Sequence, residues 1–210
     1  MSSAIGFRLL LVTDGFDGET CARAAAALDA LAPGTAAVQL RAKSLSAREL
    51  FDAGMALKRV TAERGAALLV NDRVDVARAV GAEGAHLPAR GLPLKPARRV
   101  AGEALLLGAS THSLDELRMA VRSGADYVTF GPVFPTASKA AFGPPVGVAL
   151  LEAAVREAGV PVFALGGVDA ARARECVRLG ARVACIGAVL GRADSAAGAR
   201  ALAAAIESAA

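Results

Sequence analysis

The side chains of this 210-residue chain that are best suited to chemistry form short polar groups, most of which directly follow an apolar run. The groups are Gln39, Arg41 and Lys43; Asn71, Asp72 and Arg73; His86; Ser110, Thr111 and His112; and Thr136, Ser138 and Lys139. Hydroxyl and ammonium groups bind anions, and histidine transfers protons near neutral pH. We therefore expect an anionic substrate and an available proton donor or acceptor. A helix cap or a surface loop could explain any one group, but hardly all of them together.

Two glycine segments, Gly166–Gly167 and Gly187, are typical of a phosphate site. Glycine lets backbone N–H groups approach a phosphate closely, and a following helix N-terminus adds a favourable dipole. The alternative is that both segments only form tight turns. The longest segment without a helical pattern, residues 131–147, is expected to be a binding loop or a lid.

The two histidines have different expected roles. His112 lies between a predicted strand and a predicted helix, so it can face a cleft and act as a general acid or base. His86 lies on a short strand, where a hydrogen-bonded core histidine is the favoured interpretation. The sequence indicates no cysteine nucleophile, no Ser–His–Asp triad and no G-x-G-x-x-G dinucleotide motif.

Short apolar, β-branched runs alternate with longer segments of helical periodicity along the whole chain. The predicted strands cover residues 8–13, 36–41, 67–71, 84–87, 105–110, 127–131, 160–165 and 183–188. The predicted helices cover residues 19–31, 47–64, 74–80, 96–100, 114–123, 148–157, 170–179 and 195–208. Two sequence pairs fit the capping box of a helix start, and one aspartate fits a simple N-cap: Ser46 with Glu49, Ser113 with Glu116, and Asp169.

Strict alternation of strand and helix predicts parallel strands that are joined by crossover helices. Eight units of about 26 residues fit a small (β/α)8 TIM barrel, and we expect residues 1–210 to form this single domain. A doubly wound parallel sheet is the alternative. In a barrel the active face lies at the carboxyl ends of the strands, and the polar groups fall at those ends.

Composition excludes several classes of protein. With 54% hydrophobic and 21% charged residues, the chain can build a core and is not disordered, a disulfide scaffold or a coiled coil. The net charge is +4, but the basic residues are scattered, so no nucleic-acid partner is expected. Cys21, Cys176 and Cys185 lack disulfide or zinc spacing and are expected to be buried thiols. No signal-like or membrane-spanning run is seen, so we expect a cytoplasmic protein without a membrane partner.

Seven motifs, taken in order, resemble the thiamine phosphate synthase/TenI superfamily. They are Val38-Gln-Leu-Arg-Ala-Lys43, Val70-Asn-Asp-Arg73, Gly84-Ala-His-Leu87, Ser110-Thr-His-Ser113, Ala125-Asp-Tyr127, Gly131-Pro-Val-Phe-Pro-Thr136 with Lys139, and Leu165-Gly-Gly167. The resemblance covers nearly the whole chain. It implies a (β/α)8 barrel, usually a homo-oligomer, that acts on a phosphorylated thiazole in thiamin biosynthesis.

Two activities occur among the proteins that this chain resembles. The synthase joins a pyrimidine methyl diphosphate to a thiazole phosphate, with Mg2+ and with loss of diphosphate. TenI-like members instead aromatise a thiazole phosphate carboxylate by proton transfer. The resemblance to synthases implies pyrimidine and diphosphate contacts from Gln39, Arg41, Lys43, Asn71, Ser110 and Lys139. It also implies a thiazole phosphate site at Thr136, Ser138 and Gly167, and one Mg2+ ligand at Asp72.

One segment departs from the synthase pattern. Synthases typically carry Gly-Gln-x-Asp after the fourth-strand His-Leu, and this aspartate is the second Mg2+ ligand, whereas this chain reads Pro88-Ala-Arg-Gly91. Together with the Gly-Pro-Pro segment after Lys139, this favours a TenI-like tautomerase that needs no metal cofactor. In that interpretation the catalytic residues are His112 and Lys139, and the phosphate-binding residues are Gly166, Gly167 and Gly187. A synthase with a modified Mg2+ site is the alternative, and a non-catalytic ligand sensor on the same barrel is a third.

Overall fold

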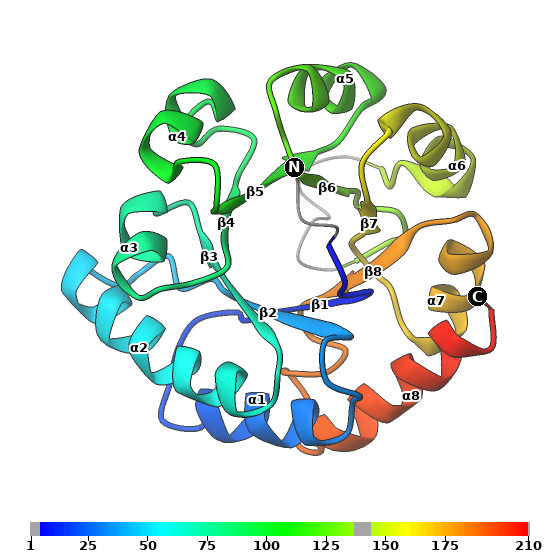
Figure 1. The fold of residues 1–210 in the computed structure, drawn as a ribbon. Helices are drawn as coiled ribbons and strands as arrows, with labels where there is room; N and C mark the ends of the chain where they lie inside the picture. The colour runs from blue at the N-terminus through cyan, green and yellow to red at the C-terminus, as the bar shows by residue number, and fades with distance from the viewer. Residues whose placement is uncertain (1–4, 137–143, 210) are drawn as a thin grey trace.

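The computed structural model describes residues 5–136 and 144–209, and in these ranges the chain forms a closed barrel of eight parallel strands (Figure 1). The strands are β1 (Leu9–Val12), β2 (Ala36–Leu40), β3 (Ala67–Asn71), β4 (Gly84–Leu87), β5 (Leu106–Thr111), β6 (Tyr127–Phe130), β7 (Val162–Ala164) and β8 (Arg182–Cys185). The helices are α1 (Thr20–Asp29), α2 (Ala47–Glu63), α3 (Val74–Ala79), α4 (Leu94–Ala101), α5 (Leu114–Arg122), α6 (Gly147–Ala158), α7 (Ala170–Arg178) and α8 (Ser195–Glu207). β8 pairs with β1 and closes the barrel. The predicted (β/α)8 fold is confirmed, and the doubly wound alternative is wrong.

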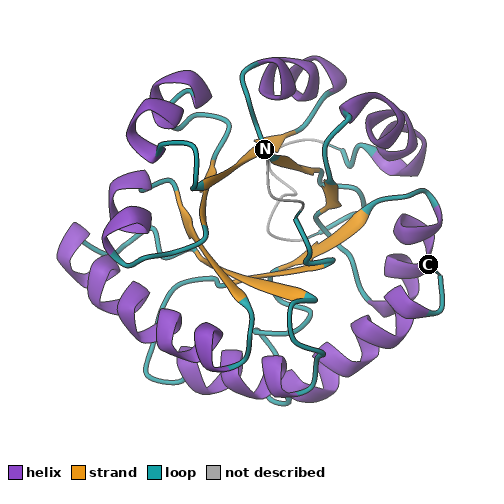
Figure 2. Ribbon diagram, viewed as in Figure 1, coloured by secondary structure: helices purple, strands orange, loops and turns teal. Residues whose placement is uncertain are grey.

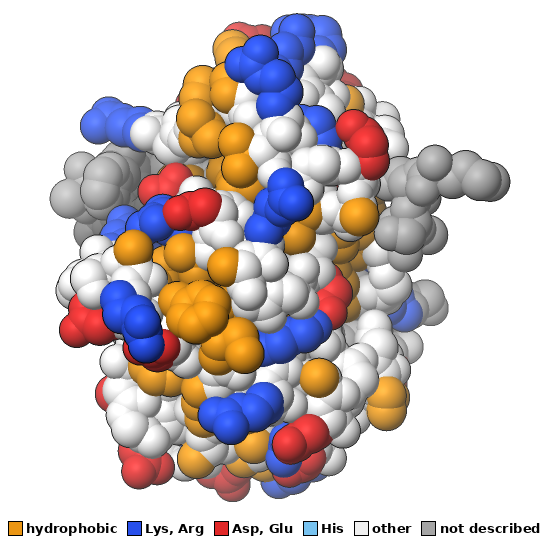
Figure 3. Space-filling view, turned by 60° about the vertical axis from the view of Figure 1, so that its left-hand side comes forward, with side chains coloured by type: hydrophobic (Ala, Val, Ile, Leu, Met, Phe, Trp, Pro, Cys, Tyr) orange, Lys and Arg blue, Asp and Glu red, His pale blue; other side chains and the backbone are white. Residues whose placement is uncertain are grey.

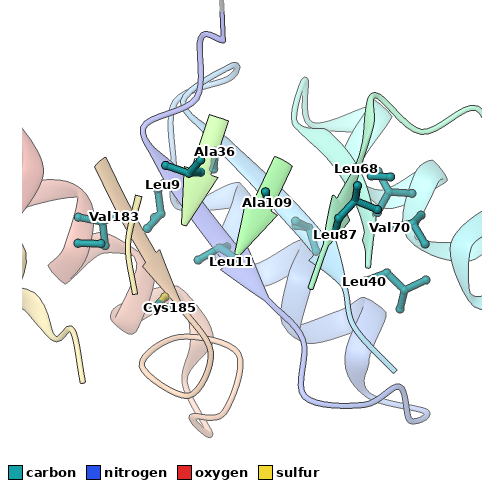
Figure 4. Packing of buried hydrophobic residues seen from close by; sticks show 14 of the residues in the cluster. Leu9, Leu11, Ala36, Leu40, Leu68, Val70, Leu87, Ala109, Val183 and Cys185 are labelled. Atoms are coloured by element: carbon teal, nitrogen blue, oxygen red, sulfur yellow. The ribbon is translucent and has the colours of Figure 1, made fainter. Parts of the chain in front are cut away.

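Both faces of the strands are buried, because the helices form an outer ring around them (Figure 2). Leu9 and Leu11 of β1 belong to a large cluster that also includes helix residues, and Figure 4 shows this outward-facing set. Leu10 and Val12 belong to a smaller cluster that fills the barrel interior together with residues of other strands and with Ile5 and Phe7, which precede β1. Strands that are buried on both faces need apolar residues at successive positions. This need explains the continuous apolar runs of the sequence.

The barrel interior changes from apolar to polar toward the carboxyl ends of the strands. On β2 the inward-facing Ala37 is followed two residues later by Gln39, and on β3 Leu69 is followed by Asn71. Residues two apart on a strand point to the same face. A polar layer therefore stands on the apolar interior and faces the open end of the barrel, which we call the mouth.

Helix starts follow the predicted capping chemistry in two cases and differ in a third. Ser46 and Glu49 form a complete capping box at α2, and the Asp169 carboxylate caps α7. At α5 the Ser113 hydroxyl accepts from the Glu116 N–H, as expected. However, the Glu116 carboxylate accepts from the N–H of His112, at 2.7 Å, and not from that of Ser113. The second half of the box has thus moved one residue toward the strand.

Several predicted element ends are wrong. The strands predicted at 160–165 and 183–188 shorten to β7 and β8, and residues 187–191 form a turn that is partly buried. The strand predicted at 183–188 extends into this turn because Ile186 and Ala188 are apolar like a strand, as is the buried Val189 that follows. The helix predicted at 96–100 begins earlier, at Leu94. Pro96 is accepted there because the first N–H groups of a helix have no partner within the helix.

The distribution of surface charge and the state of the cysteines can be compared with what the composition predicts. Figure 3 shows a face on which Lys and Arg are interspersed with Asp and Glu, so no large patch of one charge forms there. In the ranges that the structure describes, no helix is long and apolar enough to cross a membrane. All three cysteines are free. Cys176 and Cys185 are buried, and burial raises the pKa of both thiols to about 12, whereas Cys21 is only partly buried.

Candidate functional site

The polar layer at the mouth begins with Gln39 at the end of β2. The residue is 3% exposed, and its side-chain amide nitrogen is buried without a hydrogen-bond partner among the described residues. A buried donor without an acceptor is costly, and proteins tolerate few of them. Gln39 is therefore suited to bind a ligand that brings an acceptor into the barrel. Asn71 ends β3 in the same layer and is half-buried.

Arg41 and Lys43 follow β2 in the loop toward α2. The Thr13 hydroxyl accepts from the Arg41 N–H at 2.8 Å and donates to its carbonyl at 3.1 Å, which fixes this backbone against the end of β1. The Arg41 guanidinium forms an ion pair of 2.8 Å with Asp14, and Lys43 is exposed. An anion at the mouth can thus bind Arg41 in exchange for an exposed carboxylate.

Asp72 follows β3 with a left-handed backbone, φ 66°, and its N–H donates to the His86 carbonyl at 2.8 Å. Its carboxylate lies against the segment after β4, because a Cβ placed on Gly91 would be 2.7 Å from Asp72 Oδ1. That segment, residues 88–91, is where synthases carry their second carboxylate, and here it has none. Over the described ranges, no group of three or more His, Cys, Asp or Glu side chains gathers for a metal. Mg2+ is commonly held by one or two carboxylates together with substrate phosphates, and Asp72 fits that mode.

His86 lies inside the barrel and is 3% exposed. Its Nε2 lies 2.9 Å from the Ser110 hydroxyl, and its Nδ1 lies 3.1 Å from the hydroxyl of Tyr127. Burial lowers the pKa of His86 to about 4, so the ring is neutral at pH 7. The interpretation of His86 as a hydrogen-bonded core residue is confirmed. Its partner Ser110 is half-buried at the end of β5.

His112 is exposed and follows β5. Its Nδ1 is hydrogen-bonded to the carbonyl of Gly131, at the start of the loop after β6. A carbonyl oxygen can only accept, so Nδ1 carries a proton and the neutral ring keeps its lone pair on Nε2. His112 thus both joins β5 to the loop after β6 and offers a base. Its catalytic role stays a prediction.

The glycines after β7 pack tightly against the loop after β6. A Cβ on Gly166, φ 95°, would lie 2.6 Å from Pro132, and one on Gly167, φ 66°, would lie 2.6 Å from the Pro135 carbonyl. The N–H groups of both glycines donate to no backbone acceptor among the described residues, so they can serve an anion. Gly187 after β8 differs, because a Cβ there would meet nothing within 4 Å. Space does not require a glycine at that position.

The remaining predicted residues lie on the loop after β6. Thr136 is half-buried, while Ser138 and Lys139 lie outside the described residues. Sequence reasoning missed Arg172 on α7, which donates to the Gly167 carbonyl at 2.7 Å and stacks its guanidinium 5.0 Å from the centre of the Phe134 ring. It also missed Thr13 and Asp14, which hold Arg41. Only their place after β1 could have indicated them.

The family model described as thiamine monophosphate synthase matches residues 9–189 of this chain, which span all eight strands. The chain belongs to this family. It is 45% identical, over 94% of its length and 93% of the relative's, to a putative thiamine-phosphate synthase of Geobacter sulfurreducens. It is 41% identical to a thiamine-phosphate synthase of Methanoculleus marisnigri, over 94% of each chain.

Solved structures agree with the family assignment. The thiamine phosphate pyrophosphorylase from Pyrococcus furiosus superposes with a TM-score of 0.87 at 33% identity, over 98% of each chain. A 3-hexulose-6-phosphate synthase superposes with a TM-score of 0.69 at 20% identity and supports the barrel fold alone. The family thus places this chain in thiamine biosynthesis. The relatives carry the synthase name, so the preference for a tautomerase is not supported.

Proposed function

We propose that this chain is a thiamine-phosphate synthase, which joins a pyrimidine methyl diphosphate to a thiazole phosphate and releases diphosphate. The observation that carries the proposal is the family match from β1 to the turn after β8, together with relatives of that name over nearly the whole chain. In the reaction the pyrimidine methylene carbon loses its bond to a diphosphate oxygen and gains one to the thiazole ring. The protein must therefore hold two anionic substrates and stabilise a departing diphosphate.

The mouth offers suitable groups for the pyrimidine diphosphate. The buried amide of Gln39 needs an acceptor, which a heteroaromatic ring nitrogen supplies. Asn71 and Ser110 stand in the same layer, and Arg41 and Lys43 add positive charge above it. Arginine binds phosphate oxygens in a two-point fork, whereas lysine acts as a compact charge. Charge that develops on the diphosphate would meet donors that are already in place.

Mg2+ would be held by Asp72 and by phosphate oxygens of the substrate. When bound, it neutralises charge on the leaving diphosphate. The missing second carboxylate weakened the synthase interpretation at the level of sequence. A single carboxylate is compatible with Mg2+ when phosphates complete the coordination. We therefore expect weaker Mg2+ binding without substrate, but no loss of the reaction itself.

The thiazole phosphate would bind between the loops after β6 and β7. Gly166 and Gly167, after β7, supply backbone N–H groups, and Thr136 lies on the loop after β6. Ser138 and Lys139 are proposed to complete the site.

The odd number of cysteines, all of them free, favours a cytoplasmic location, and the family resemblance favours a homo-oligomer.

The test is an assay of the purified protein with the pyrimidine diphosphate and the thiazole phosphate, with Mg2+ and with EDTA. We expect thiamine phosphate and diphosphate to form in equal amounts, and only with Mg2+. The variant Asp72→Asn keeps the size and the left-handed backbone of the residue but removes the carboxylate, so it should need more Mg2+ for the same rate. No product from the wild type, together with accelerated aromatisation of the carboxylated thiazole, would refute the synthase proposal.

A further inference from the structure

Two buried side chains and one half-buried side chain form a series of hydrogen bonds that leads from the barrel interior to the mouth. Tyr127 on β6 is fully buried, and its hydroxyl lies 3.1 Å from His86 Nδ1. His86 on β4 in turn has Nε2 at 2.9 Å from the Ser110 hydroxyl and at 3.5 Å from that of Thr129. Ser110 is the member of this series nearest the mouth, since it is the last but one residue of β5 and is half-buried.

The Tyr127 ring is held in one position. Phe7 packs edge-on against it at 6.2 Å between ring centres, and Phe163 does so at 5.5 Å. Gly108 on β5 makes room for it, because a Cβ there would lie 2.0 Å from Tyr127 Cζ. Because the ring is fixed, the Tyr127 hydroxyl can form a hydrogen bond only with a group that already lies beside it. In the described structure that group is His86.

The hydrogen atoms of the three groups can be arranged in two ways. If His86 carries its proton on Nδ1, that N–H donates to Tyr127, and the tyrosine hydrogen has no acceptor among the described residues. If the proton is on Nε2, Tyr127 donates to Nδ1 and the Nε2–H donates to Ser110. The hydrogens of Tyr127 and His86 are then both used, and the hydroxyl hydrogen of Ser110 stays available. Buried donors without acceptors are rarer than acceptors without donors, so the second arrangement is favoured.

In the favoured arrangement Ser110 accepts from His86 and keeps its own hydrogen. In the other arrangement, the Ser110 hydroxyl donates its hydrogen to His86 Nε2. The tautomer of His86 therefore decides whether Ser110 presents a donor or a lone pair to the mouth. A donor attracts the oxygens of an anionic phosphate group, and a lone pair repels them.

We propose that Tyr127 and His86 are positioning residues. Tyr127 holds His86 as the Nε2–H tautomer, and His86 in this form makes Ser110 a hydrogen-bond donor toward a substrate phosphate. The identity of that phosphate, the diphosphate of the pyrimidine, rests on the proposed function. The tautomer does not, and it can be measured without any substrate.

The first experiment is side-chain 15N NMR of the full chain at pH 7. The chain has two histidines, so the variant His112→Gln assigns the His86 signals. We expect a protonated Nε2 and an unprotonated Nδ1 for His86 in the wild type. In Tyr127→Phe we expect the Nδ1 resonance to move, because its donor is gone. A proton on His86 Nδ1 in the wild type would overturn the proposal.

The second experiment is a double-mutant cycle on kcat/KM for the pyrimidine diphosphate. Ser110→Ala should lower it by about tenfold or more, since a hydrogen bond to a charged group is lost. Tyr127→Phe should lower it by about fivefold in the wild type, but by less than about twofold in the Ser110→Ala background. The control Phe7→Leu touches the same ring without a hydrogen bond. It should lower the Tm and leave kcat/KM within about twofold.

The outcomes separate the two proposals. If Tyr127→Phe acts equally in both backgrounds, its effect does not pass through Ser110 and the positioning role is wrong. The same holds if Phe7→Leu lowers kcat/KM as much as Tyr127→Phe does. If the wild type makes no thiamine phosphate, the proposed function fails, and the NMR result still decides the tautomer.

Discussion

Neutral, buried His86 predicts a specific loss of stability in mild acid. Burial lowers its pKa from 6.5 to about 4, while in the unfolded chain the pKa returns to about 6.5. Below pH 6.5 the unfolded state therefore binds a proton that the folded state takes up only near pH 4. The stability that comes from this difference is present above pH 6.5 and is lost as the pH falls from 6.5 to 4.

The size of the effect follows from the pKa difference. Lowering the pKa from 6.5 to about 4 corresponds to about 3 kcal/mol of unfolding free energy lost between pH 7 and pH 4. The entropy of unfolding is about 2.1 cal/mol/K per residue, or about 0.44 kcal/mol/K for this chain. The Tm should thus fall by about 7 °C because of His86 alone.

The assay compares the Tm of the wild type with that of His86→Gln at pH 7 and pH 4. Glutamine keeps a polar side chain but does not titrate. Other groups, such as Asp17 with its pKa lowered to about 2 by hydrogen bonds from Arg23, cancel in the comparison. His112→Gln is the matched control, because His112 is exposed. If His86→Gln loses as much Tm in acid as the wild type, the imidazole is not held neutral and the reasoning is refuted.

Three further predictions concern backbone space, metal binding and the loop after β7. Gly108→Ala should abolish folding or lower the Tm strongly, because its Cβ would lie 2.0 Å from Tyr127 Cζ, whereas Gly187→Ala should leave the Tm unchanged. Circular dichroism melting measures both. Asp72→Asn should raise the Mg2+ concentration for half-maximal synthase activity by about tenfold or more, measured by Mg2+ titration, with an unchanged Tm. Arg172→Ala should raise the KM for the thiazole phosphate and cost about 1–2 kcal/mol of stability, since it loses a hydrogen bond and a stacked ring.

Each of these has an outcome that contradicts it. A well-folded Gly108→Ala protein would mean that Tyr127 is not packed against β5. An unchanged Mg2+ titration in Asp72→Asn would remove this carboxylate from the metal site. An unchanged thiazole KM in Arg172→Ala, with a lowered Tm, would make that arginine a purely structural residue.

The barrel itself could be predicted from the sequence because its signals are local. Each strand is a short apolar run that is buried on both faces, and each helix repeats with its own period. Caps such as Ser46 and Asp169 involve residues three apart, so spacing alone finds them. The sequence was less informative at β7 and β8, where the same apolar residues can fill a strand or a packed turn.

The candidate site was predicted only in part. Strand ends supplied Gln39, Asn71 and Ser110, because the carboxyl ends of parallel strands meet at one face. The same reasoning gave the missing carboxylate near Arg90 great weight and so favoured the tautomerase branch, which the names of the relatives do not support. A motif comparison weighs one absent ligand heavily, although substrate phosphates can replace a protein ligand of Mg2+.

What the sequence by itself determined is the set of elements and the polar residues at their ends. Only the tertiary structure decided which of those residues touch. His86, Ser110 and Tyr127 lie up to 41 positions apart, and strand register brings them within hydrogen-bond distance. Register depends on how all eight strands close, and a buried hydrogen must find an acceptor in that one arrangement. The proton positions at the mouth are therefore a property of the closed barrel and not of any motif in the chain.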